Sequence, residues 1–141
     1  TWPAAMPADT FTAFRQLCAE DCAAGLKRFV LLCSQGAAQP RALSRQLLEA
    51  AAVADSGCAL AGLDLLAELD NRAAISAFAG PQLHLFAEQD ALVPSLALSR
   101  VRALNAQATV EFFGHSHAGL IVGAQLLAQR IADFVLRGQH A

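Results

Sequence analysis

The sequence predicts an α/β fold in which a wholly helical part is followed by two parallel strands and their helices. Apolar residues recur at helical spacing throughout residues 8–70. Two short apolar runs then follow, at 82–87 and 108–113, with a helical pattern between them. A strand–helix–strand order favours parallel pairing through a right-handed crossover. We therefore expect a helical subdomain over residues 1–70 and a strand-containing part over residues 71–141.

The helical part divides into four predicted helices, each with a start or stop signal of its own. Asp9 is a candidate N-cap for the first helix, and Gly36 suits the position just after the end of the second. Pro40 favours the first turn of the third helix, which we expect to end at Gly57. The four predicted helices cover residues 9–21, 20–36, 39–57 and 59–71.

The second part alternates strands and helices. A Gly-Pro break precedes the first predicted strand, and a helix begins at Pro94 or Ser95 between the two strands. After the second strand, the apolar periodicity of residues 119–138 predicts one long amphipathic helix that ends near Gly138. Two strands are too few for a stable sheet. We therefore expect further strands to come from a segment that this sequence does not contain.

The composition of the 141-residue chain argues against several classes of function. Its formal net charge of −2 gives no global attraction to nucleic acid or to an anionic membrane. No run approaches the roughly 18 uncharged apolar residues of a membrane-spanning helix, and the first residues lack the pattern of a secretory signal. Hydrophobic residues make up 55% of the chain, more than the ~45–50% usual in soluble domains, so some apolar surface needs a further cover.

The cysteines and the first residue indicate the context of the chain. Cys18, Cys22, Cys33 and Cys58 form no C-x-x-C pair, and we expect them to be small buried thiols. That pattern fits a reducing cytoplasm. The first residue is Thr rather than Met, so we expect the chain to start partway through a longer product.

The stretch "FFGHSHAGL", residues 112–120, carries the main candidate chemistry and admits two interpretations. In the first, it is the sharp strand-to-helix turn that presents a nucleophilic serine, here Ser116. That arrangement requires an acid and a histidine after the serine, each on its own loop. Nearly all residues after Ser116 belong to one predicted helix, so we reject Ser116 as the nucleophile. The second interpretation makes His117 a catalytic base.

The acid partner of His117 is predicted upstream, in "LHLFAEQDALVP". Asp90 follows the first predicted strand, as His117 follows the second. Because neighbouring parallel strands end at the same edge of a sheet, we expect the carboxylate and the imidazole within hydrogen-bonding distance. Such a carboxylate fixes the tautomer of the histidine and stabilises the imidazolium as it forms. The two residues would then be the acid–base half of a nucleophilic triad.

The remaining histidines predict no further site. His115 is expected to point away from His117, and His84 to be a hydrogen-bonded histidine on a face of the sheet. The three residues lack Asp, Glu or Cys companions at the spacing of a zinc site. The sequence therefore predicts neither a metal nor a cofactor.

With both loops identified, the chain resembles the C-terminal half of an α/β-hydrolase. "LFAEQDALVP" matches the acid loop and "FFGHSHAGL" the histidine loop. The opening "TWPAAMPADTFTAF" and the segment "LKRFVLLCSQG" are similar to the helical lid of the esterases that act on pimeloyl-acyl-carrier-protein methyl ester in biotin synthesis. The resemblance covers nearly the whole chain. It implies that residues 1–70 form a four-helix lid and residues 71–141 the C-terminal part of the hydrolase core.

The resemblance implies roles for residues of the lid. Phe14 and Phe29 match aromatic residues that line the channel for the acyl chain. Three arginines match basic residues that bind the acidic carrier protein with its pimeloyl methyl ester; these are Arg28, Arg41 and Arg45. A fourth basic residue, expected one turn before Arg28, is Ala24 in this chain.

The resemblance assigns Asp90 as the triad acid and His117 as the triad base. It also implies that two parts of the family's active site are absent from this sequence. In the family, the nucleophile elbow and the oxyanion hole precede the lid, and this sequence contains no G-x-S-x-G. The implied function is a Ser-Asp-His carboxylesterase whose serine lies on a missing N-terminal half, so we expect the chain alone to be inactive. The alternatives are a non-catalytic fragment or helical module that binds an acidic carrier or another partner, or a different esterase or lactonase of the same fold.

Overall fold

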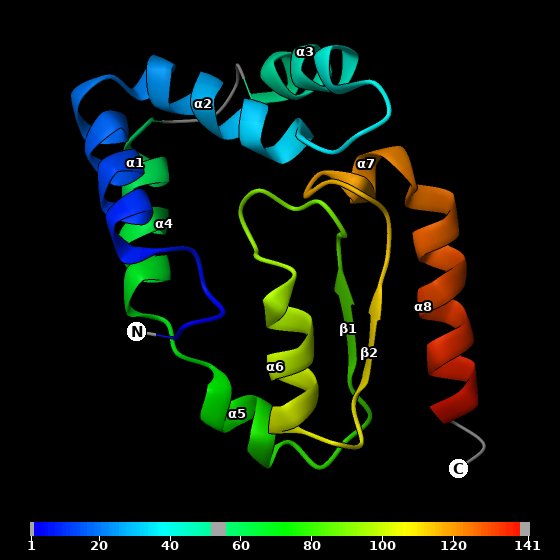
Figure 1. The fold of residues 1–141 in the computed structure, drawn as a ribbon. Helices are drawn as coiled ribbons and strands as arrows, with labels where there is room; N and C mark the ends of the chain where they lie inside the picture. The colour runs from blue at the N-terminus through cyan, green and yellow to red at the C-terminus, as the bar shows by residue number, and fades with distance from the viewer. Residues whose placement is uncertain (1, 52–55, 139–141) are drawn as a thin grey trace.

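We describe the protein from a computed structural model, which defines residues 2–51 and 56–138. Helices dominate, and two short strands lie side by side within the second part of the chain (Figure 1). No helix in those two ranges has the length and apolarity needed to cross a membrane.

The first part of the chain folds into four helices, as predicted. They are α1 (Ala8–Glu20), α2 (Cys22–Ser34), α3 (Pro40–Ala51) and α4 (Ser56–Glu68). Helices α1 and α4 run side by side, and α2 and α3 lie across the end of the strands (Figure 1). Arg15 of α1 and Asp64 of α4 form an exposed ion pair.

Two of the predicted helix boundaries are wrong. Pro7 precedes α1 in the N-cap position, and Asp9 lies in the first turn, where its charge favours the helix N-terminus without capping it. Gly57 lies inside α4 and does not end α3. The N-cap of α2 is Asp21, whose carboxylate accepts a hydrogen bond from the Ala24 N–H at 2.9 Å.

One helix was not predicted, and one predicted helix is divided. Helix α5 (Arg72–Ala77) is too short for a periodic signal, and the Asp70 carboxylate accepts from its first N–H at 3.1 Å. The long helix expected over 119–138 is instead α7 (Gly119–Val122) and α8 (Ala124–Gly138). The separation occurs at Gly123, whose φ of −115° and ψ of 26° depart from helical geometry.

The two strands are parallel neighbours, as predicted. Strand β1 (Leu83–Phe86) pairs with β2 (Thr109–Phe112), with Leu83 opposite Thr109 and Phe86 opposite Phe112. They form a two-stranded sheet, so within the described ranges each strand has one edge without a strand neighbour.

The sheet has a helix on each side. Helix α6 (Leu96–Leu104), which follows Ser95 as its N-cap, packs Leu98 and Val101 against Val110 of β2. On the opposite face, Glu111 of β2 pairs with Arg130 of α8. Side chains alternate between faces along a strand, so consecutive residues of β2 meet different helices.

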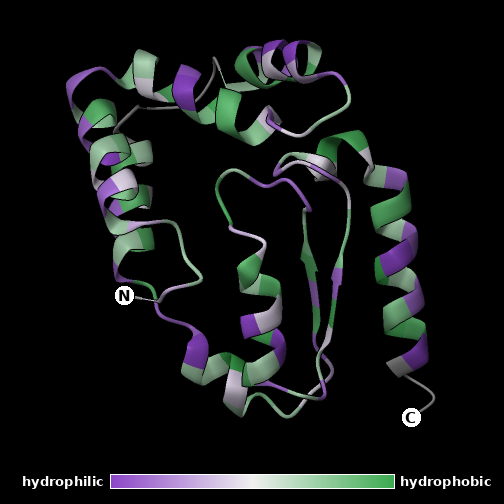
Figure 2. Cartoon of the chain, in the orientation of Figure 1, coloured by the Kyte–Doolittle hydropathy of each residue, from purple (hydrophilic) through white to green (hydrophobic). Residues whose placement is uncertain are grey.

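Apolar surface remains outside these contacts. Helix α8 presents both hydrophobic and hydrophilic residues along its length (Figure 2). Several of its apolar side chains are at least 45% exposed; they are Leu126, Ile131, Val135 and Leu136. Among the described residues, buried apolar side chains cluster at the α6–sheet contact and where α2 and α3 meet the loop after β2.

Candidate active site

The ends of the two strands bring Asp90 and His117 together. The Asp90 Oδ2 and the His117 Nδ1 lie 2.9 Å apart, so the predicted contact between carboxylate and imidazole is present. Asp90 lies four residues beyond the end of β1, and His117 five residues beyond the end of β2. Parallel pairing delivers both loops to the same edge of the sheet.

Main-chain hydrogen bonds hold the two loops against each other beyond the strands. The Phe113 N–H donates to the Phe86 carbonyl at 2.7 Å, and the Glu88 N–H donates to the Gly114 carbonyl at 3.2 Å. The Gln89 N–H donates to the His115 carbonyl at 2.9 Å. Gly114 has a φ of +73°, a conformation that glycine adopts without strain. The contact between Asp90 and His117 therefore rests on a backbone framework and not on one side-chain bond.

Asp90 is a buried carboxylate with three hydrogen-bond donors. Its side chain is 7% exposed. Its Oδ1 accepts from the N–H groups of Leu92 at 2.8 Å and Val93 at 2.9 Å, while Oδ2 faces His117. Burial alone would raise the pKa of Asp90, but the bonds from His117, Val93 and Leu92 outweigh burial and lower it. Asp90 is therefore ionised at neutral pH.

His117 is more open to solvent than its partner, with 39% of its side chain exposed. The hydrogen bond to Asp90 raises the pKa of His117, against the opposing effect of burial, and the negative charge of Asp90 adds to the rise. An ionised carboxylate only accepts, so the Nδ1 of His117 carries a proton in either charge state. Nε2 is then the ring nitrogen that can take up and release a proton.

A second carboxylate–histidine pair lies beside the first. The His115 Nδ1 and the Glu88 Oε2 are 2.8 Å apart, at the same sequence separation of 27 residues as Asp90 and His117. Both side chains are exposed, His115 by 63% and Glu88 by 49%. His115 was expected to point away from His117, and its partner Glu88 was not predicted. The repeated separation was the signal that could have identified it.

The rejected nucleophile, Ser116, is 3% exposed. Its carbonyl accepts from the Gly119 N–H at 2.9 Å, within the turn that leads into α7.

The loop that carries His117 also contacts the helical part. The Ala118 N–H donates to the Cys33 carbonyl at the end of α2, at 3.0 Å. Cys33, Leu43 and Ala118 form one buried cluster, with Leu92 from the acid loop packed against it. Burial raises the pKa of the Cys33 thiol to about 11, and the nearby charge of Asp90 contributes to that rise. The thiol is therefore neutral beside the carboxylate.

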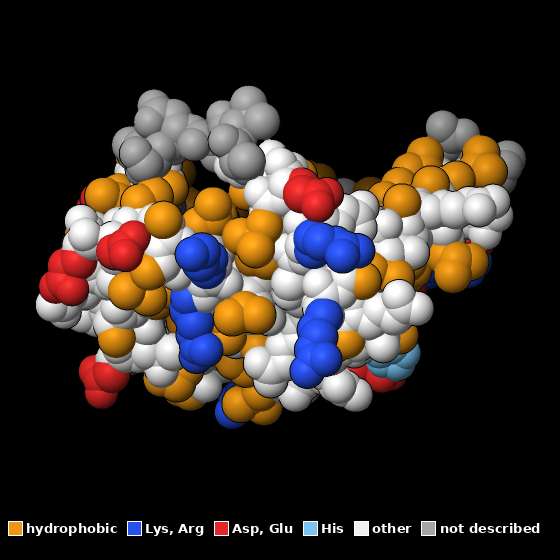
Figure 3. All heavy atoms as spheres, turned by 90° about the horizontal axis from the view of Figure 1, so that it is seen from above, with side chains coloured by type: hydrophobic (Ala, Val, Ile, Leu, Met, Phe, Trp, Pro, Cys, Tyr) orange, Lys and Arg blue, Asp and Glu red, His pale blue; other side chains and the backbone are white. Residues whose placement is uncertain are grey.

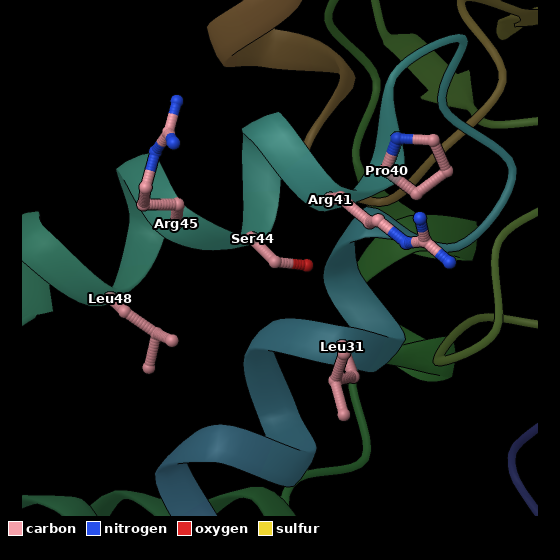
Figure 4. Close-up of a pocket in the computed structure, with 6 residues that line it drawn as sticks. All are labelled: Leu31, Pro40, Arg41, Ser44, Arg45 and Leu48. Carbon is pink, nitrogen blue, oxygen red and sulfur yellow. The ribbon is translucent and has the colours of Figure 1, made fainter.

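The predicted basic residues lie on the outer surface of α2 and α3 and are exposed. Lysine and arginine side chains gather on this face (Figure 3). Arg41 and Arg45 line a groove of about 340 Å³ between the two helices, and Arg28 is not among its lining residues. The other residues of this groove are Leu31, Pro40, Ser44 and Leu48 (Figure 4). Two of the three arginines therefore share one surface feature.

The two predicted aromatic residues contact each other. The ring centroids of Phe14 in α1 and Phe29 in α2 are 6.2 Å apart, with planes inclined by 33°. Phe29 is 39% exposed. A tilted pair at this distance is a favourable packing arrangement, and it leaves part of Phe29 available to another molecule.

The remaining predictions concern thiols and metal ligands. Cys18 and Cys33 are buried and Cys22 is half-buried, whereas Cys58 lies outside the residues whose side chains are described. His84 is half-buried and its Nε2 lies 2.8 Å from the Gln82 side-chain oxygen, as expected for a hydrogen-bonded histidine. Across the described part of the chain, no three His, Cys, Asp or Glu side chains converge as a metal site requires.

Comparison with known proteins identifies relatives over almost the whole chain. No protein-family model matches. The biotin biosynthesis bifunctional protein BioHC of Cellvibrio japonicus is 42% identical over 134 residues, which are 94% of this chain and 27% of that protein. The BioHC protein of Teredinibacter turnerae is 35% identical over 138 residues, 95% of this chain and 24% of that protein.

Relatives that are shorter than the bifunctional proteins also match almost the whole chain. The pimeloyl-[acyl-carrier protein] methyl ester esterase of Xanthomonas campestris pv. campestris is 34% identical over 140 residues, 95% of this chain and 54% of that enzyme. The chain thus spans about half the length of this esterase and about a quarter of the bifunctional proteins. Over almost the whole of its length, the chain is therefore similar to part of the pimeloyl-[acyl-carrier protein] methyl ester esterases and of the BioHC proteins of biotin biosynthesis.

Proposed function

We propose that the chain is part of a carboxylic ester hydrolase with the α/β-hydrolase fold, in which Asp90 is the acid and His117 the base of a Ser-Asp-His mechanism. One observation carries the proposal. The buried carboxylate of Asp90 contacts the half-exposed imidazole of His117 at 2.9 Å, where two parallel strands end. The relatives named as esterases support the reaction class.

In this mechanism His117 transfers protons, and Asp90 remains ionised throughout. The Nε2 of His117 takes the proton from a serine hydroxyl supplied outside the 141 residues, and the serine oxygen bonds to the ester carbonyl carbon. The imidazolium, stabilised by ionised Asp90, returns that proton to the departing methoxide, which leaves as methanol. Water then attacks the acyl-enzyme, His117 takes its proton, and the serine recovers that proton as the acid is released.

The proposed substrate is pimeloyl-acyl-carrier-protein methyl ester, the compound in the names of the esterase relatives. Carrier proteins of this kind present acidic surfaces and a phosphate-linked arm, which attract arginine. Arg41 and Arg45, beside apolar Leu31 and Leu48, offer both charge and apolar contact on the outer face of the helical part. Arg28 is proposed to extend this surface, and Phe14 and Phe29 to contact the acyl chain.

A chimera tests the reaction. The 140 matched residues of the Xanthomonas campestris esterase are replaced by this chain, so that the relative supplies the rest of the enzyme. We expect the chimera to hydrolyse p-nitrophenyl acetate and pimeloyl-acyl-carrier-protein methyl ester. His117→Ala should lower kcat at least about 10³-fold, while His115→Ala, at the exposed second pair, should retain most activity. A folded chimera whose activity is unaffected by His117→Ala would contradict the proposed base.

A second candidate function is binding without catalysis, and the groove of Arg41 and Arg45 favours it because it lies wholly on the helical part. Calorimetric titration of the chain with an acyl-carrier protein distinguishes the two. Binding that is lost in Arg41→Ala/Arg45→Ala, together with an inactive folded chimera, would support the binding module in place of the hydrolase.

A further inference from the structure

The turn between α2 and α3 contacts both loops of the proposed active site. We call residues 33–37 the corner. It contains the end of α2 at Ser34, the C-cap residue Gln35, and Gly36, which has a φ of +85°. The corner lies above the ends of β1 and β2 (Figure 1), where the loops with Asp90 and His117 emerge.

Gly36 approaches these loops more closely than any side chain would permit. A Cβ at this position would lie 2.6 Å from the Cβ of Gln89, 2.8 Å from the His115 carbonyl oxygen and 3.0 Å from the Gln89 carbonyl oxygen. Gln89 precedes Asp90 and belongs to the acid loop, whereas His115 belongs to the histidine loop. The Gln89 N–H and the His115 carbonyl are the two groups of the main-chain bond that joins these loops. Gly36 therefore lies directly over the joint between acid and base.

Two further contacts fix the corner to the same place. The Cys33 carbonyl accepts from the N–H of Ala118, the residue after His117, at 3.0 Å. Cys33 and Leu43 bury Ala118, and Leu92 of the acid loop packs against this cluster. The corner thus contacts the chain on both sides of His117, at His115 and Ala118, and it contacts Gln89 immediately before Asp90.

From this arrangement we infer that the corner is a positioning element for the proposed acid–base pair, and that Gly36 is its positioning residue. The inference rests on the proposed function of Asp90 and His117. Gly36 touches neither reacting group; it allows the end of α2 to press on the loop joint, which sets the distance between the carboxylate and the imidazole. The helical part then determines the geometry of the pair as well as covering it.

The opposing view is that Gly36 only relieves backbone strain in a turn. Two variants separate these views. Gly36→Ala introduces both the strain at positive φ and the Cβ that meets Gln89 and His115. Gly36→Asn introduces the same Cβ with less strain, because Asn tolerates the left-handed region better than Ala. Gly62→Ala is the matched control, since a Cβ at Gly62 in α4 meets nothing within 4 Å.

The experiment follows the imidazole of His117 by NMR in the full chain, with ¹⁵N-labelled histidine and a pH titration. We expect wild type and Gly62→Ala to show a raised His117 pKa and an Nδ1 proton engaged by a carboxylate. In Gly36→Ala and Gly36→Asn the pKa should return toward ~6.5, the ordinary value for histidine, with loss of the Nδ1 signature. Urea unfolding of each variant reports whether it is folded.

A rescue makes the test specific. Gln89→Gly removes the atom that the new Cβ would meet at 2.6 Å, so Gly36→Ala/Gln89→Gly should recover part of the raised His117 pKa. A His117 titration unchanged in both single variants would overturn the inference, and so would a change seen in Gly36→Ala but not in Gly36→Asn. The NMR titration requires no catalytic turnover. An inactive chimera would therefore count against the proposed function, whereas an unchanged His117 titration would count against the positioning inference.

Discussion

Replacing Asp90 by Asn should remove the charge that stabilises protonated His117 while leaving the local backbone intact. The Asn side chain has the same shape, and its oxygen can still accept from the N–H groups of Leu92 and Val93. The loss is then confined to the bond with His117. A charge-assisted hydrogen bond contributes roughly 1.5–3 kcal/mol. Because 39% of the His117 side chain is exposed, solvent screening reduces this, and we expect a loss of about 1 kcal/mol in the free energy of unfolding.

The pH dependence of this loss follows from the direction of the pKa shift. The pKa of His117 is raised in the folded chain, so folding favours the protonated imidazole. Its contribution to stability is complete below the unfolded pKa of ~6.5 and disappears as pH rises through the higher folded pKa. The difference between wild type and Asp90→Asn should therefore be largest near pH 5–6 and smaller near pH 9, where the partner of Asp90 is a neutral imidazole. Asp90 itself acts in the opposite direction: its lowered pKa stabilises the fold above ~3.8, and this is lost in acid.

Urea unfolding at pH 5.5 and pH 9, followed by circular dichroism, measures both quantities. Glu88→Gln is the matched control, since it removes a carboxylate at the same sequence separation from its histidine, but in a pair that solvent surrounds. It should change stability little at either pH. An Asp90→Asn loss that is equal at the two pH values would refute the assignment of a stabilising charge to Asp90. A loss of stability in Glu88→Gln as large as that in Asp90→Asn would refute the inference that burial makes the charge of Asp90 more stabilising than the charge of Glu88.

Three further predictions concern the groove, the buried thiol and the core. In the chimera, Arg41→Ala/Arg45→Ala should slow hydrolysis of pimeloyl-acyl-carrier-protein methyl ester, and the effect should be larger at low salt. Hydrolysis of p-nitrophenyl acetate should be nearly unchanged. Equal losses of activity on both substrates would indicate that the arginines support folding. Alkylation of Cys33 at pH 8, followed by mass spectrometry, should be about a hundredfold slower in the folded than in the unfolded chain, because its pKa is about 11 when folded. Leu98→Ala should cost roughly 2–3 kcal/mol by urea unfolding because Leu98 is 8% exposed, whereas Leu96→Ala, 47% exposed in the same helix, should cost far less.

The features that the sequence could predict depend on local patterns. The apolar runs at β1 and β2, separated by a helix, were enough to predict parallel strands with Asp90 and His117 at one edge. The start of α3 at Pro40 and the glycine after α2 were predicted from preferences that belong to single residues.

What could not be predicted depends on contacts between distant residues or on small departures from regular geometry. Gly36 was expected as a helix terminator, but its approach to Gln89 and His115 exists only because α2 lies over the strand ends. Helices α7 and α8 share one apolar period, and only the backbone angles of Gly123 show that they are separate. The pair of Glu88 with His115 depends on the register of two loops, which the sequence indicates only through the 27-residue separation that this pair shares with Asp90 and His117.

The two carboxylate–histidine pairs show why environment, and not spacing, selects the candidate site. Both pairs join the same loops at the same separation, and their histidine–carboxylate distances differ by only 0.1 Å, 2.8 Å against 2.9 Å. Glu88 is half-exposed, so water competes for its charge and the pair with His115 does little beyond local contact. Asp90 is 7% exposed and satisfied by two N–H groups, so its charge is held in place and acts on His117 through little solvent. His117 in turn keeps enough exposure for its second nitrogen to meet a substrate. A base needs both conditions, and of these two histidines only His117 has them.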